Sequence, residues 1–163
     1  MYYLNLYFIG AFLGFLYGSF LKNTFFPEIN NGILYGPWIP VYGIGVVVTS
    51  YISNKSFKLK VNKILRILIF LSLTFVILTL IEEIGGLLIK IFFHKTFWNY
   101  RKFRFNLGPY ISLETSFLWC LLSSIFVFYL KPLLELFIKK IPKYFTFGIS
   151  CLFLVDLFIT FLV

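Results

Sequence analysis

Long apolar runs, separated by short clusters of charge, proline and glycine, make up this chain. A helix needs roughly 20 residues to cross about 30 Å of hydrocarbon. Five runs come close to that length, at about residues 2–21, 37–53, 67–89, 111–130 and 144–163. Each run is predicted to be a helix, because unpaired strand edges in lipid leave backbone groups without hydrogen bonds. The segment 132–141, between Pro132 and Pro142, is predicted to be a short interfacial helix.

The pattern therefore predicts an all-α fold: a polytopic membrane helix bundle of about five transmembrane helices plus the interfacial helix. Composition agrees with this prediction. Of 163 residues, 60% are hydrophobic and only 13% are charged, whereas a soluble domain carries charge at about a quarter of its positions. A soluble enzyme, a disordered chain and a disulfide scaffold are excluded. We expect one integral membrane domain, 1–163, because no linker or composition break divides the sequence.

The charged residues concentrate at the ends of the apolar runs and in the segments between them. Lys and Arg number 15 against 6 Asp and Glu, for a formal net charge of +9. If all five runs cross, most of the basic residues fall on the N-terminal side. The positive-inside rule then predicts a multi-pass protein of the cell membrane with a cytoplasmic N-terminus. Nucleic-acid binding is not expected, because it needs a contiguous basic face.

Acidic residues inside the apolar runs are more informative, because each costs about 2.5–3.5 kcal/mol at mid-membrane on insertion scales. Such residues are expected to face the bundle interior or water. By the predicted topology they lie in the external half of the bundle. Four qualify: Glu82, Glu83, Glu114 and Asp156. Glu82, Gly86 and Lys90 also share one helix face, so that a carboxylate and an amine bracket a glycine notch.

The segment 94–110 interleaves basic and aromatic residues. One interpretation is an aromatic belt at the lipid interface, with basic side chains that snorkel to water. The other is the wall of a polar vestibule, in which Arg101 or Arg104 neutralises one of the acids. Both stay open. The candidate substrate-binding residues are Glu82, Glu83, Glu114, Arg101, Arg104, Asp156, Trp98, Tyr100, Asn106 and Tyr42.

Glycines at strict four-residue spacing mark the first run, at Gly10, Gly14 and Gly18. Together with Gly86 in the third run, they are candidate helix-packing positions, because small residues on one face let another backbone approach closely. Packing within the chain is the ordinary interpretation of this stripe. A homodimer seam through the same glycines is the alternative.

A second unusual stretch precedes the second run. Gly36, Pro37, Pro40 and Gly43 predict a structural turn, because two prolines three residues apart prevent a regular first helical turn. Irregular backbone at membrane depth is tolerated only where protein or a water-filled cavity covers it. By the predicted topology, the turn lies on the same side as the acids and the basic aromatic loop. We therefore expect these three features to be able to line one site.

Three motifs resemble those of a known family, the small bacterial membrane proteins of the CmpB-type ABC-transporter permease family. Residues 36–43 are similar to its Gly-Pro-x-x-Pro-x-Tyr-Gly, and Glu82 with Gly86 to its Glu-x-x-x-Gly. Residues 98–100 and 105–108 are similar to its Trp-Asp-Tyr and Phe-Asn region. The chain departs at Asn99, where the family usually has Asp, and at Gly18, where relatives often carry Glu. The resemblance implies a permease that works with an ATPase.

Function follows from what the chain carries and lacks. It has no Gly-x-x-x-x-Gly-Lys-Ser/Thr phosphate loop, so a permease needs a separate ATPase subunit. Five spans are few for one translocation path, so we also expect a homo-oligomer. The leading hypothesis is a transport or permease-like subunit with an externally facing polar site. The alternatives are an integral membrane enzyme, in which Glu82 or Glu114 acts with His94 on a lipid-borne substrate, and a non-transporting scaffold or regulator.

Catalysis is the less favoured of these readings, because the sequence holds no Ser-His pair and no Cys-rich cluster. No residue is assigned as catalytic, and no cofactor or metal is expected. Cys120 and Cys151 lie inside apolar runs and are predicted to be small buried hydrophobic residues.

Overall fold

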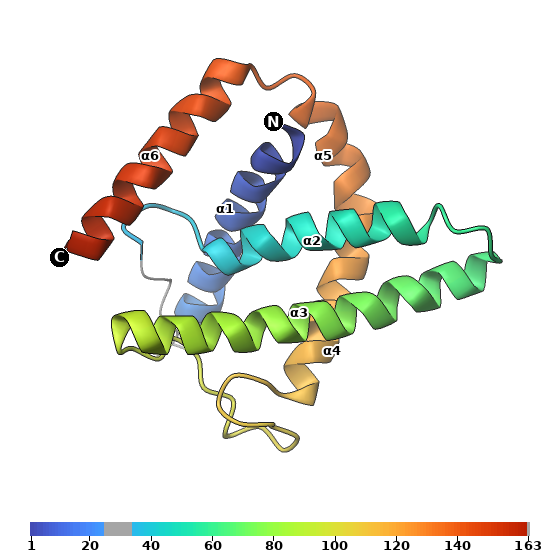
Figure 1. Ribbon diagram of the computed structural model, residues 1–163, viewed down its shortest axis with the longest axis horizontal. Coiled ribbons are helices and arrows are strands. Elements are labelled where there is room, and N and C mark those ends of the chain that lie inside the picture. Colours follow the sequence, from blue (N-terminus) through green and yellow to red (C-terminus); the bar gives the residue numbers. More distant parts are fainter. Residues whose placement is uncertain (25–33, 163) are drawn as a thin grey trace. The chain divides into compact units, whose positions relative to one another are not determined.

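Helices account for almost all of the regular structure in this computed structural model, which describes residues 1–24 and 34–162 (Figure 1). Val163, the end of the predicted fifth run, lies outside the described residues. The helical elements are α1 (Tyr2–Thr24), α2 (Pro40–Ser56), α3 (Lys63–Phe93), α4 (Leu113–Ile125), the π-helix η1 (Phe126–Leu130), α5 (Lys131–Ile138) and α6 (Lys143–Leu162). Within the described ranges the only β pairing is an isolated bridge between Asn106 and Ser112. The predicted all-α class is confirmed.

Among the described residues, four helical segments are long and apolar enough to cross a membrane: Tyr2–Phe20, Lys63–Phe93, Leu113–Ile138 and Lys143–Thr160. The helix α2 has 17 residues, or roughly 25 Å at 1.5 Å per residue, and is not among the four. It begins at Pro40, because the first helical position needs no backbone N–H and the fixed φ of proline suits it. The crossing of α2, and with it the predicted orientation of the N-terminus, stays a prediction.

The segment predicted as a separate interfacial helix continues the helical backbone of α4 and η1. The Lys131 N–H reaches back five residues to Phe126 O, which is the wider spacing of a π-helix. Pro132 follows directly, and its ring would clash with the preceding turn of a regular α-helix. The π-helical turn is a common way to fit such an interruption without ending the helix. The position of α5 at the membrane surface stays a prediction.

The described chain divides into two compact units, which we describe separately: unit 1, residues 1–47 and 132–163, and unit 2, residues 48–131. In unit 1, α1 and the first half of α2 approach closely through glycines. A Cβ on Gly10 would lie 2.8 Å from Val46 Cβ, and a Cβ on Gly14 would overlap the Tyr42 ring. The faces of Gly10 and Gly14 are therefore packed within the chain by α2. Whether the chain forms one domain stays a prediction.

In unit 2, α3 packs against α4, and the connection between them folds beside both helices (Figure 1). The helix α3 begins after Asn62, whose side chain accepts a hydrogen bond from Leu65 N at 2.7 Å. It ends at His94, which adopts the left-handed conformation with φ 52°. The buried face of α3 repeats every four residues at Phe70, Thr74, Leu78, Glu82 and Gly86. One helix face therefore carries both the acidic residue and the glycine notch toward the interior.

Candidate functional site

Glu82 is the centre of the candidate site in unit 2. Its side chain is 3% exposed, on the buried face of α3. Tyr100 donates its O–H to Glu82 Oε1 at 2.7 Å, and the Trp119 side chain is a second hydrogen-bonding neighbour. Glu82 Oε2 is buried and has no hydrogen-bond partner within the described part of the chain. A buried polar atom without a partner is uncommon in folded proteins and calls for an explanation.

Aromatic side chains of the loop between α3 and α4 pack directly against α3 at Gly85 and Gly86. Tyr110 is 3% exposed and covers Gly86, where an added Cβ would lie 2.5 Å from Tyr110 Cδ1. Trp98 lies over the neighbouring Gly85 and meets the Tyr110 ring edge-on, with centroids 6.2 Å apart. With the Tyr100–Glu82 hydrogen bond, three aromatic residues of the loop therefore hold one stretch of α3.

Backbone hydrogen bonds give the loop a defined fold. Tyr100 N donates to Pro109 O at 2.7 Å, and Leu107 N to Ile111 O at 3.0 Å. Gly108 takes a positive φ of 81°, which glycine adopts without strain. The Asn106 side chain donates to Phe103 O at 2.7 Å, and Glu114 Oε1 accepts from Phe105 N at 3.1 Å. Asn106 and Glu114, both predicted to contact substrate, hold the loop in this structure.

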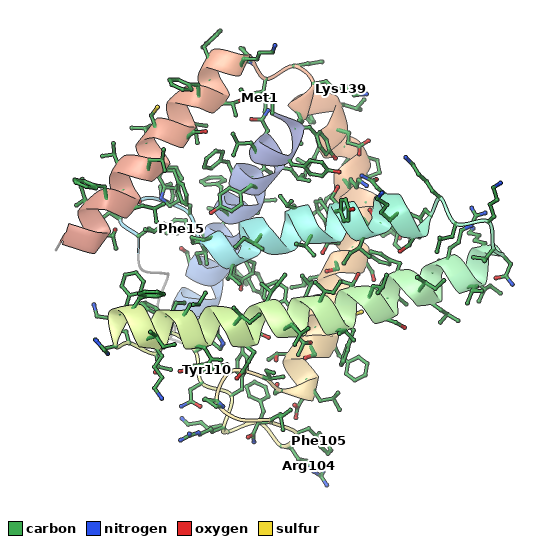
Figure 2. All side chains as sticks on the ribbon, viewed as in Figure 1. Met1, Phe15, Arg104, Phe105, Tyr110 and Lys139 are labelled. Carbon is green, nitrogen blue, oxygen red and sulfur yellow. The ribbon has the colours of Figure 1, made fainter. Side chains whose placement is uncertain are left out.

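The basic residues of the loop lie on its outer side. Arg101 and Arg104 are exposed, and the Arg104 guanidinium stacks over the Phe105 ring at 5.3 Å. Figure 2 shows Arg104 and Phe105 at the outer end of the loop, whereas Tyr110 lies beside α3. Among the described residues of unit 2, neither arginine forms an ion pair with a carboxylate. The loop thus packs Trp98, Tyr100 and Tyr110 against α3, whereas Phe103 and Phe105 are exposed, as its charged residues are.

Other buried polar atoms of unit 2 share with Glu82 Oε2 the lack of a partner. Glu83 Oε2, Glu114 Oε2 and Trp98 Nε1 are buried, and none has a hydrogen-bond partner among the described residues. Together these atoms offer carboxylate oxygens as acceptors and an indole N–H as a donor. His94, the residue suggested to act with an acid in the enzyme alternative, is exposed and lies twelve residues beyond Glu82, or roughly 18 Å along α3.

Asp156, in unit 1, has a different environment. Its carboxylate is 7% exposed and accepts hydrogen bonds from Tyr35 N at 3.0 Å, Gly36 N at 2.8 Å and Trp38 Nε1 at 2.6 Å. Thr160 on the same helix adds a weaker contact at 3.3 Å. Asp156 therefore anchors the turn before α2, and Gly36 is required there because a Cβ would overlap the Trp38 ring.

The predicted residues thus fall into two groups. Unit 1 holds Tyr42, Asp156 and the residues predicted to form the turn, of which Gly36 and Pro37 precede α2 whereas Pro40 and Gly43 are part of its first helical turn. Unit 2 holds the others: Glu82, Glu83, Trp98, Tyr100, Arg101, Arg104, Asn106 and Glu114. The hypothesis that they line one site stays a prediction. Tyr110 and Trp119 are not among the predicted residues, although the adjacent glycines at 85 and 86 indicate that another group approaches α3 closely. Within the described ranges, no group of three His, Cys, Asp or Glu side chains is placed to hold a metal ion.

The fold and its apolar helices define an all-α membrane protein. The family described as "Putative ABC-transporter type IV" matches residues 2–162, and the chain belongs to this family. The resemblance noted in the motifs is thereby confirmed, and the chain is a membrane protein of ABC-transporter type. No curated protein and no solved structure shows significant similarity to it.

Proposed function

We propose that this chain is the membrane subunit of an ABC-type transport system, and that Glu82, Glu83 and Trp98 form its solute-contacting site. The observation that carries the proposal is the buried Glu82 carboxylate, which uses one oxygen for Tyr100 and leaves the other without a partner among the described residues. Leaving such a group unsatisfied costs about 1–3 kcal/mol, and more for a charged group. Evolution tolerates such a cost most readily at functional sites.

The chemistry of the unpaired atoms indicates the kind of solute. Glu82 Oε2 and Glu83 Oε2 accept hydrogen bonds, and Trp98 Nε1 donates one. A hydroxylated solute satisfies both kinds of group, because a hydroxyl donates and accepts, whereas an ammonium satisfies only the carboxylates and a purely apolar solute satisfies neither. The basic side chains Arg101 and Arg104 stand on the outer side of the loop, where they would meet a solute or a partner before the site does.

The proposal includes partners and a location. A separate ATPase subunit supplies nucleotide hydrolysis, because the sequence carries no phosphate-binding loop. Self-association provides further helices for a translocation path. The chain resides in the bacterial cell membrane with its N-terminus in the cytoplasm, as the distribution of basic residues favours.

Copurification from native membranes tests the proposal. We expect a nucleotide-binding subunit to copurify with the chain, and ATP hydrolysis by the complex to fall at least several-fold in Glu82→Gln. Glu135→Gln is the matched control, because Glu135 lies on α5, outside the site, and contacts Tyr2 at 3.1 Å. A chain that brings down no nucleotide-binding subunit, or a Glu82→Gln complex as active as the control, contradicts the proposal.

A further inference from the structure

A stripe of buried polar side chains runs along unit 2, beyond the site described above. These residues are the N-cap of α4, Ser112, and then Ser116, Ser123 and Lys131 near one face of the helical segment from α4 to α5. Each of the last three meets a polar side chain of a facing helix. Ser116 pairs with Thr79 at 2.8 Å, Ser123 with Thr49 at 3.2 Å, and Lys131 Nζ with Ser53 Oγ at 2.9 Å. The interior of unit 2 is therefore more polar than apolar.

Helix packing accounts for the paired members of this stripe, because hydroxyl hydrogen bonds join helices in lipid. It does not account for the unpaired ones. Ser50 and Thr74 are 0% exposed and Ser56 is 2% exposed, yet their hydroxyls have no partner within the described residues. Alanine or valine would pack in these positions without leaving a buried hydroxyl unsatisfied. Buried polar groups of this kind are where ordered water molecules bind.

We propose that unit 2 holds a proton path, completed by bound water, that runs from Glu82 to Lys131. The length fits a membrane. Fifteen residues separate Ser116 from Lys131, or roughly 22 Å of helix, and Glu82 lies about one turn beyond Thr79, the partner of Ser116. Together these spans approach the roughly 30 Å of the hydrocarbon core.

Proton transfer suits this set of groups better than transport of a metal ion. A calcium-like cation takes six to eight oxygen ligands at one point, whereas the stripe offers one or two oxygens at each level. In a proton path each hydroxyl or water accepts one proton and passes on its own. Each step thus breaks one O–H bond and forms another, except at Lys131 Nζ, where an N–H bond is exchanged for an O–H bond, and no oxidant or reductant is consumed. Glu82 and Lys131 are the titratable groups at the two ends, with Glu83 and Tyr100 beside Glu82.

Thr74 is the critical link. About seven residues of α4, or roughly 10 Å, separate the Thr79–Ser116 pair from the Thr49–Ser123 pair. This part of α3 runs beside α4, because Cys120 Sγ also lies 3.4 Å from Leu71 O, and Thr74 is on its buried face between Phe70 and Leu78. Its hydroxyl is the buried oxygen without a partner on that stretch of α3. Removing this hydroxyl takes away the side-chain oxygen of that stretch of α3, so the proton path is interrupted there.

The test uses the full chain, purified and reconstituted in liposomes without any other protein. A potassium diffusion potential drives protons, and a pH-sensitive dye inside the vesicles reports the flux. We expect the wild type to exceed protein-free vesicles, and Thr74→Val and Glu82→Gln each to lower the flux at least ten-fold. Ser72→Ala is the matched control on α3, because Ser72 is exposed and outside the stripe, and its flux should equal that of the wild type.

Two outcomes overturn the proposal: wild-type flux at the protein-free level, or Thr74→Val flux equal to that of Ser72→Ala. Elution as a single species in detergent checks folding. Should Thr74→Val fail that check, Ser50→Ala, which removes another unpartnered hydroxyl from α2, takes its place with the same expected loss. The measurement needs no ATPase, so it can fail while the proposed transport function stands, and the reverse also holds.

Discussion

The contact between Gly86 and Tyr110 can be tested with a single methyl group. In Gly86→Ala, the new Cβ would lie 2.5 Å from Tyr110 Cδ1 and Cγ and 3.0 Å from its Cβ. Carbon atoms in favourable contact are about 3.5–4.0 Å apart, so the ring would have to move by about 1 Å. Tyr110 is almost fully buried, and Trp98 packs against its edge. Overpacking of this kind typically costs about 1–3 kcal/mol.

Gly85→Ala is the matched control, one residue away on the same helix. Its Cβ would meet only Trp98 Cη2, at an ordinary distance of 3.8 Å. Both substitutions gain the helix preference of alanine over glycine, about 1 kcal/mol, so this gain cancels in the comparison. We therefore expect Gly86→Ala to be about 1–3 kcal/mol less stable than Gly85→Ala, with Gly85→Ala equal to or more stable than the wild type.

The assay is denaturant unfolding of the three proteins in one detergent, followed by tryptophan fluorescence. Because Trp98 packs against Tyr110, its emission should also shift more in the folded Gly86→Ala protein than in Gly85→Ala, whose new Cβ meets Trp98 only at an ordinary contact distance. Equal unfolding free energies for the two variants would refute the seating of Tyr110 on Gly86. The loop would then owe its position to other contacts.

Three further predictions concern other contacts. The Asp156 carboxylate accepts hydrogen bonds from three N–H groups, whereas Asp156→Asn leaves one acceptor oxygen. We therefore expect the free energy of unfolding to fall by about 1–3 kcal/mol, measured by thermal denaturation, and an unchanged melting temperature contradicts the anchoring role. A double-mutant cycle with Thr49→Val and Ser123→Ala should give a coupling of about 0.6 kcal/mol, and zero coupling would mean that the hydroxyls do not meet. Gly14→Leu should destabilise by at least about 1–3 kcal/mol, because α2 occupies the space, while Gly148→Leu, with nothing within 4 Å, should be tolerated in the same melting assay.

Much of the fold is visible in the sequence because lipid restricts the choices. A run of apolar residues that must hydrogen-bond its own backbone can only be a helix, so the helical runs are readable from their lengths. The error lies at the proline-containing segments. Pro132 predicts a break, yet the helix continues through a π-helical turn, since the i→i+5 hydrogen bond of Lys131 gives the backbone a different route past the proline. Local sequence does not reveal which route is taken.

The candidate site is only partly readable. The sequence marks Glu82 as costly in a membrane and Gly86 as a notch, but the occupant of that notch, Tyr110, lies 24 residues later in an irregular loop. Lys131 shows the same limit. By sequence it belongs to the basic residues that flank the runs, whereas the structure buries it against Ser53 and Asn54. Periodicity identifies a helix face and carries no information about what packs against it.

By itself, the sequence determines that this protein is a set of membrane helices with a few ionisable residues inside them, because the energy of transferring each residue into lipid depends on local composition. Only the tertiary structure decides what those residues do. Asp156 and Glu82 have similar free-energy costs of insertion into lipid, but their hydrogen-bond partners differ. Asp156 is satisfied by the N–H groups of a distant turn, whereas Glu82 keeps an oxygen that no described group satisfies. The difference arises from donors far away in the chain, which only folding brings within hydrogen-bonding distance.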